Sequence, residues 1–154
     1  MKKVILIALA FVSLSVHAQL QLVKGGRPVS EIIVDPKSPR PVLTAARELR
    51  HAVKLITGAE LPIVDAPRDA GGTQIYLISG ESPLLKNYAA DFEKLRGNDG
   101  YAVRTDGHKL FLFAAEPRGV INGVNRLIYK NTDLIWARPY RETAVYTKSG
   151  DLAL

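Results

Sequence analysis

Apolar residues recur at steps of three and four positions in two long stretches, a spacing typical of helices that bury one face. The first stretch follows Pro41 and ends at Gly58, a residue type that commonly terminates a helix in the left-handed conformation. The second follows Pro117. The two apolar stripes are Leu43, Ala46, Leu49, Val53 and Ile56, and then Val120, Ile121, Val124, Leu127 and Ile128. Each stripe needs a partner surface, most simply a sheet.

Shorter apolar runs between turn residues predict the strands. Residues 74–78 and 110–113 are apolar on both faces, which is typical of central strands covered on two sides. Residues 61–64 contain Pro62, which favours an edge strand because proline cannot donate to a sheet ladder. Residues 20–23 and 31–34 are expected to pair as a hairpin.

Three further elements complete the predicted fold. Asp106-Gly107 between apolar runs predicts a tight hairpin turn with positive φ at both residues. Residues 84–96 have helical spacing, with Ser82 as the expected cap, and residues 134–136 and 143–146 predict terminal strands. Together the elements predict an α+β domain with a mixed, largely antiparallel sheet and two or three helices packed mainly on one face.

The first 18 residues have the layout of a cleavable secretory signal. Lys2 and Lys3 precede an apolar run over residues 4–12, and Ala18 supplies the small residue before the expected cleavage site. An N-terminal anchor helix is the alternative, but the apolar run is too short to span a bilayer. We therefore expect residues 1–18 to be a signal peptide and residues 19–154 to be one domain, periplasmic or secreted, with no membrane segment after cleavage.

Composition narrows the chemistry further. The chain has no cysteine, so it has neither a disulfide framework nor a thiol nucleophile. Its net charge of +6 comes from scattered basic residues without an aromatic-interleaved stripe, which argues against a nucleic-acid partner. The three histidines, His17, His51 and His108, are widely separated and fit no zinc-site spacing. We expect no metal and no cofactor.

Carboxylates are the remaining candidates for catalysis, since two of them suffice for glycoside hydrolysis. The acids that cluster in sequence or follow strands are Glu81, Asp91, Glu93, Asp99 and Glu116. Nearby pairs arise by chance among 15 acids, and no spacing assigns an acid and a base. No catalytic residue is assigned, and whether the chain is an enzyme stays open.

The last predicted helix carries a candidate docking or binding face. Gly119 and Gly123 lie one turn apart on the same side, which indicates close approach to a strand or to another domain. Arg118 is expected to pair with Asp99 or Glu116. Trp136 is interpreted first as a core residue, with an interface or sugar-stacking role as the alternatives. The candidate face comprises Arg118, Gly119, Gly123 and Trp136.

Several short motifs, taken in order, resemble a known accessory domain. They are the residues 22–28 run Leu-Val-Lys-Gly-Gly-Arg-Pro, Ile32-Ile33-Val34, Ala45-Ala46-x-Glu48-Leu49, Ile56-Thr57-Gly58, Asp99-Gly100-Tyr101, Pro117-Arg118-Gly119 and Trp136-x-x-Pro139. Their order resembles the N-terminal, non-catalytic domain of bacterial α-glucuronidases and β-N-acetylhexosaminidases. The chain departs from that pattern over residues 130–134, where a glycine is usual.

The resemblance implies a zincin-like α+β fold and a glycoside hydrolase context, with the catalytic carboxylates in a downstream barrel absent from this chain. We therefore expect an exported accessory domain whose partner is a catalytic barrel, in cis in relatives, or a polysaccharide. The alternative is a free-standing carbohydrate-binding module, and a small hydrolase using its own carboxylates is a third hypothesis. A binding module would use exposed aromatics drawn from Tyr76, Tyr88, Tyr101, Tyr140 and Tyr146.

Overall fold

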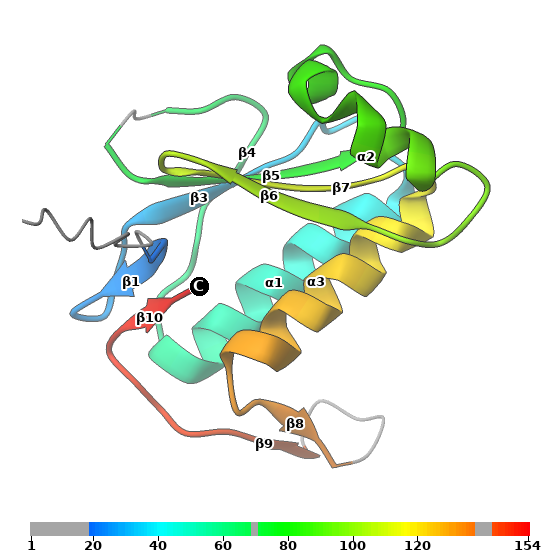
Figure 1. Cartoon of the computed structure of the whole chain (residues 1–154). Helices are drawn as coiled ribbons and strands as arrows, with labels where there is room; N and C mark the ends of the chain where they lie inside the picture. Colours follow the sequence, from blue (N-terminus) through cyan, green and yellow to red (C-terminus); the bar gives the residue numbers. More distant parts are fainter. Residues whose placement is uncertain (1–18, 69–70, 138–142) are drawn as a thin grey trace, which may run out of the picture.

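A five-stranded sheet lies between two helical layers (Figure 1). The structure, a computed structural model, describes residues 19–68, 71–137 and 143–154. The strands of this sheet, in spatial order, are β4 (Ile63–Val64), β3 (Ser30–Ile33), β5 (Thr73–Ser79), β7 (Lys109–Ala114) and β6 (Ala102–Asp106). The order confirms β5 and β7 as inner strands and β4 as an edge strand.

The long helices α1 (Arg40–Thr57) and α3 (Pro117–Asn131) lie side by side on one face of the sheet (Figure 1). The 3₁₀ helix η1 (Pro83–Tyr88) and the short helix α2 (Ala89–Lys94) cover the other face. This arrangement confirms helices mainly on one face. The Ser82 hydroxyl accepts a hydrogen bond from the Leu84 N–H, as predicted, but the capped segment begins as a 3₁₀ turn.

Alternation along the central strands divides the core between the two layers. Ile75 and Leu112 belong to the cluster beneath α1 and α3, whereas Tyr76, Phe111 and Phe113 belong to the cluster beneath η1 and α2. In the second cluster Tyr76 stacks on Phe111 at 4.9 Å and Tyr88 stacks on Phe113 at 5.9 Å. Burial on both faces explains why these strands are apolar throughout.

The predicted α+β class with a mixed sheet is confirmed. Among the strands that the structure describes, four pairings are antiparallel and three are parallel. The parallel pairings join β4, β3, β5 and β7, and β6 runs antiparallel to β7. The other antiparallel pairs belong to two small sheets, formed by β10 (Leu152–Ala153), β1 (Gln21–Lys24) and β2 (Arg27–Pro28), and by β8 (Ile135–Trp136) and β9 (Ala144–Val145).

The predicted pairing of residues 20–23 with residues 31–34 is wrong. Gly25 and Gly26 adopt positive φ values of 55° and 72°, so the turn is tight and β1 pairs with β2 immediately after it. All four residues of β3 are buried. Burial favours the position that β3 takes between β4 and β5, where strands cover both of its edges.

The second predicted hairpin is confirmed in its strands and wrong in its turn residues. Asp106 pairs with Lys109, which leaves Gly107 and His108 as the two-residue loop. Gly107 has a φ of 57°, and no described residue other than glycine has a positive φ. Of the two residues expected to have a positive φ, Gly107 alone has one, and glycine tolerates it without steric cost.

Some predictions concern residues outside the described part of the chain, namely the signal peptide over residues 1–18, Pro139 and Tyr140. Within the described part, no helix combines the length and apolar character needed to cross a membrane.

Candidate functional site

The two glycines of the last helix face the chain's own hairpin. A Cβ added at Gly119 would lie 2.3 Å from the Gly100 carbonyl oxygen and 2.6 Å from the Ala114 Cβ. A Cβ added at Gly123 would lie 2.9 Å from Cγ of Tyr101. The close approach to a strand is thus observed. Both glycines are buried at this contact.

Arg118 lies in the first turn of α3, whereas Trp136 lies beyond the other end of the same helix. Nη1 of Arg118 lies 3.4 Å from a carboxylate oxygen of Asp99, so the predicted Arg118–Asp99 pair is confirmed. Trp136 follows the last residue of α3, Asn131. A 15-residue helix is about 22 Å long, so the four candidate residues do not converge on one site.

The hairpin of β8 and β9 is anchored to the outer side of the helical layer. Leu134, which immediately precedes β8, is 4% exposed and packs with Ala52 and Ile56 of α1. Ala144 and Tyr146 join the same cluster. Alternation along both strands therefore gives the hairpin an inner face against α1 and an outer face away from it.

Two aliphatic residues that the sequence reasoning did not single out occupy the outer face. Ile135 pairs with Val145 across the hairpin, and they are 58% and 62% exposed. Both lie in predicted strands, so alternation against Leu134 could have identified them. The missing information was the register between the strands, which depends on the intervening loop.

Trp136 is not a core residue, contrary to the interpretation favoured above. It is 40% exposed and stacks on His51 of α1, with ring centroids 6.3 Å apart and planes inclined by 13°. The short hairpin lies outside the helical layer and cannot enclose a tryptophan completely. Nε2 of His51 is buried without a hydrogen-bond partner among the described residues, which fits its position beneath this ring.

Asp133 fixes the hairpin to the segment that follows it. The Thr147 N–H donates to both carboxylate oxygens of Asp133, at 3.1 and 3.0 Å. Hydrogen bonding by Thr147, first through its side chain and then through its backbone, holds the pKa of Asp133 below its ordinary value. A lowered pKa in the folded state means that this contribution to stability is present above the unfolded-state pKa and is lost on acidification.

Asp133→Asn is therefore expected to loosen the hairpin at neutral pH, because it removes the charge that strengthens these hydrogen bonds. Hydrogen exchange of the Thr147 amide should accelerate in the variant at pH 7, whereas the two proteins should converge at acidic pH once Asp133 is protonated. Asp65→Asn, at an exposed loop position, is the matched control and should leave Thr147 protection unchanged. Equal protection at pH 7 in Asp133→Asn would contradict the assignment.

The clustered carboxylates are engaged by arginines at the surface. Asp91 pairs with Arg104 at 2.8 Å, and Arg96 pairs with Glu93 at 2.8 Å and Glu81 at 2.7 Å. The hydrogen bond from Arg96 lowers the pKa of Glu93. A glycosidase acid needs a raised pKa, which burial away from cations supplies. These exposed ion pairs therefore fit a role in stabilising the surface better than a role in proton transfer.

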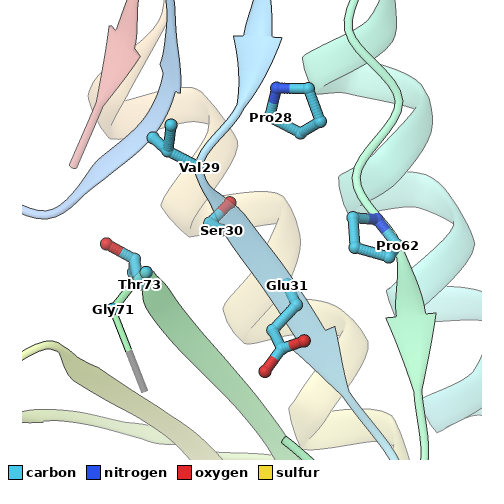
Figure 2. A pocket seen from close by; sticks show the side chains of 8 residues that line it. Pro28, Val29, Ser30, Glu31, Pro62, Gly71 and Thr73 are labelled. Atoms are coloured by element: carbon cyan, nitrogen blue, oxygen red, sulfur yellow. The ribbon is translucent and has the colours of Figure 1, made fainter. Parts of the chain in front are cut away.

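A pocket of about 450 Å³ lies at the beginning of β3 and β5 (Figure 2). Glu31, which is 8% exposed, accepts a hydrogen bond from the Arg68 N–H at 3.0 Å and so holds the loop after β4. A Cβ at Gly72 would lie 2.7 Å from the Val29 carbonyl oxygen. Close backbone packing therefore favours glycine at position 72.

Burial raises the pKa of Tyr76, and the nearby charge of Glu31 adds to the effect. Within the described ranges, no group of three or more histidine, aspartate or glutamate side chains is placed to hold a metal ion. The contact of Glu31 that the pocket shows is its hydrogen bond with the Arg68 N–H, which connects β3 to the loop after β4.

Solved structures of two glycoside hydrolases contain a similar fold. One is a family GH115 4-O-methyl-α-glucuronidase with specificity for decorated arabinogalactans, matched with a TM-score of 0.57 and 18% identity over 71% of this chain and 14% of that chain. The other is the GH20 β-N-acetylhexosaminidase of Streptomyces coelicolor A3(2), matched with a TM-score of 0.50 and 19% identity over 88% of this chain and 23% of that chain.

The resemblance expected from the sequence motifs is thus confirmed at the level of the fold. Neither a protein-family model nor a curated protein matches the chain. The chain spans less than a quarter of the length of either glycosidase, so it corresponds to a small part of each.

Proposed function

We propose that this protein is an exported accessory domain of a glycoside hydrolase, and that it packs against a catalytic barrel rather than hydrolysing glycans itself. The observation that carries the proposal is that its fold recurs as a minor part of two glycosidases of different families. The Glu93–Arg96 pair supports it, because the hydrogen bond from Arg96 lowers the pKa of Glu93 and so disfavours the protonated form that a general acid requires.

The outer face of the β8–β9 hairpin is the proposed contact with the barrel. Ile135 and Val145 form an exposed cross-strand pair on this face, whereas Trp136, the next residue of β8, faces α1 and stacks on His51. Exposed apolar residues that gather in one place mark interaction surfaces more often than isolated ones do. Leu134 and Asp133 anchor the hairpin, so its outer face is held in a fixed orientation.

Ile135→Glu is expected to weaken binding to the barrel by about tenfold or more, because a carboxylate would be buried at the contact. The barrel to use is that of the glycoside hydrolase encoded in frame with, or beside, this chain. Titration calorimetry measures the affinity. Lys37→Gln, which changes the net charge equally at an exposed position near the start of α1, should bind as the unchanged protein does. If Ile135→Glu bound the barrel as tightly as the unchanged protein, the outer face of the hairpin would not be part of the contact.

A free-standing carbohydrate-binding module is the second candidate, and four of the tyrosines that the sequence offered for it give it little support. Tyr76 is 7% exposed, Tyr88 packs on Phe111, and Tyr101 lies against the position of Gly123. Tyr146 packs in the cluster beneath the hairpin. These rings do not form one platform for stacking a sugar, although titration with glycans would reveal a binding module directly.

Export rests on the layout of residues 1–18. N-terminal sequencing of the protein recovered from a bacterial periplasm tests it, and a mature chain beginning at Gln19 is the expected result.

A further inference from the structure

A groove of about 450 Å³ runs along the outer edge of β6. Figure 1 shows β6 at the margin of the sheet, with α2 on one side and α3 on the other. Leu95 of the segment after α2 and Leu127 of α3 contribute apolar walls, and Val103 lies between them on the strand. The groove therefore borders a strand edge and is flanked by a helical segment on each face of the sheet.

The turn geometry determines which backbone groups of β6 lie on its outer edge. Asp106 and Lys109 close a two-residue hairpin loop, and such a closing pair exchanges hydrogen bonds. Pairs then alternate, so the N–H and C=O groups of Val103 and Thr105 point away from β7. The Arg104 guanidinium donates to the Val103 carbonyl at 2.8 Å, which independently places that carbonyl on the outer edge.

No described strand pairs with this edge, since β6 is the last member of its sheet. The Val103 N–H lies beside the groove, and the Thr105 N–H and C=O lie on the same edge just beyond the groove lining. Together they form a row of groups at strand spacing, about 7 Å between alternate residues. Exposed rows of this kind are templates for an added strand.

The charges of the groove select the partner. Lys94 comes from α2, and Arg126 and Lys130 from α3, and all three are exposed. The acid in the lining is Asp91, which is already paired with Arg104. A second copy of this chain pairing edge to edge would bring like charges together. An acidic segment would be attracted instead.

We propose that this groove binds an extended, acidic polypeptide segment as a sixth strand on β6. Successive side chains of such a strand point to opposite faces of the sheet. One face of the added strand meets Arg126 and Lys130, and the other meets Lys94. An anionic polysaccharide would carry the same charge as an acidic peptide, but it has no peptide N–H and C=O groups to pair with the edge of β6. The inference is independent of the contact with the barrel, which uses the hairpin of β8 and β9.

Fluorescence anisotropy of the full chain with a labelled eight-residue peptide of alternating glutamate and valine tests the proposal. Thr105→Pro removes an outward N–H without touching the bonds to β7, and should lower the affinity about tenfold. Thr105→Ala is the matched control and should bind within about twofold. The same peptide N-methylated at alternate residues should also lose affinity, which keeps the test valid if Thr105→Pro fails to fold.

Substituting glutamate for both Arg126 and Lys130 should weaken binding and flatten its dependence on salt. Undiminished binding of the N-methylated peptides, or of Thr105→Pro that circular dichroism shows to be folded, would overturn the proposal, because contact would then be by charge alone. Polygalacturonate that binds more tightly than the peptide, and equally well to Thr105→Pro, would overturn it in favour of a polysaccharide groove.

Discussion

Phe113→Ala is expected to destabilise the protein by about 3–5 kcal/mol, the range typical of removing a phenylalanine from a packed core. Phe113 is fully buried on β7, beneath the layer formed by η1 and α2. Its ring stacks with Tyr88 of η1, so the truncation leaves a cavity between this layer and the sheet. Urea unfolding followed by circular dichroism measures the loss.

Leu84→Ala is the matched control for this prediction. Leu84 belongs to the same layer but is 53% exposed, so its truncation should cost well under about 1 kcal/mol. A loss below about 1 kcal/mol for Phe113→Ala would mean that η1 and α2 do not pack on the sheet as described.

Gly119→Val is expected to destabilise the protein by about 3 kcal/mol, at the upper end of the usual cost of overpacking. Its Cβ would overlap the Gly100 carbonyl oxygen and the Ala114 Cβ. The first is a backbone atom and the second lies on the inner strand β7, so neither can move aside easily. The helix must then shift away from β7, which also loosens the contact of Tyr101 with Gly123.

Asn125→Val, at an exposed position of the same helix, controls for the low helix propensity of valine. Thermal unfolding should separate the two variants clearly, with a lower midpoint for Gly119→Val. Matching midpoints would show that α3 does not need a glycine to approach the hairpin.

The long helices and inner strands could be predicted because their residues obey local rules. The stripe from Leu43 to Ile56 repeats over four turns, and residues 110–113 are apolar on both faces. Periodicity of this length reports burial directly. The close approach of α3 was likewise readable from Gly119 and Gly123, because few other reasons favour two glycines on one side of a helix.

Features that depend on distant partners could not be predicted in the same way. Whether β3 pairs with β1 or enters the main sheet is decided by β5, which begins some forty residues later. The interpretation of Trp136 as a core residue failed for a similar reason. Its environment depends on where the terminal hairpin meets α1, and the pattern of apolar residues does not identify His51 as the residue that Trp136 meets there.

The candidate docking face changed most between sequence and structure. Its glycines are internal, and Arg118 and Trp136 are separated by the length of α3. The exposed pair Ile135 and Val145 replaces them as the centre of the proposed contact. Sequence proximity along one helix suggested a continuous face, whereas the fold uses one side of that helix for its own sheet.

Hydrolysis of aryl glycosides by the purified chain, including the α-glucuronide and the N-acetyl-β-glucosaminide, is the most direct measurement of the central claim. A rate indistinguishable from that of buffer is the predicted result. Sustained turnover that disappears when a carboxylate such as Asp91 or Glu93 is replaced by its amide would show that this domain carries its own catalytic centre, and would contradict the account.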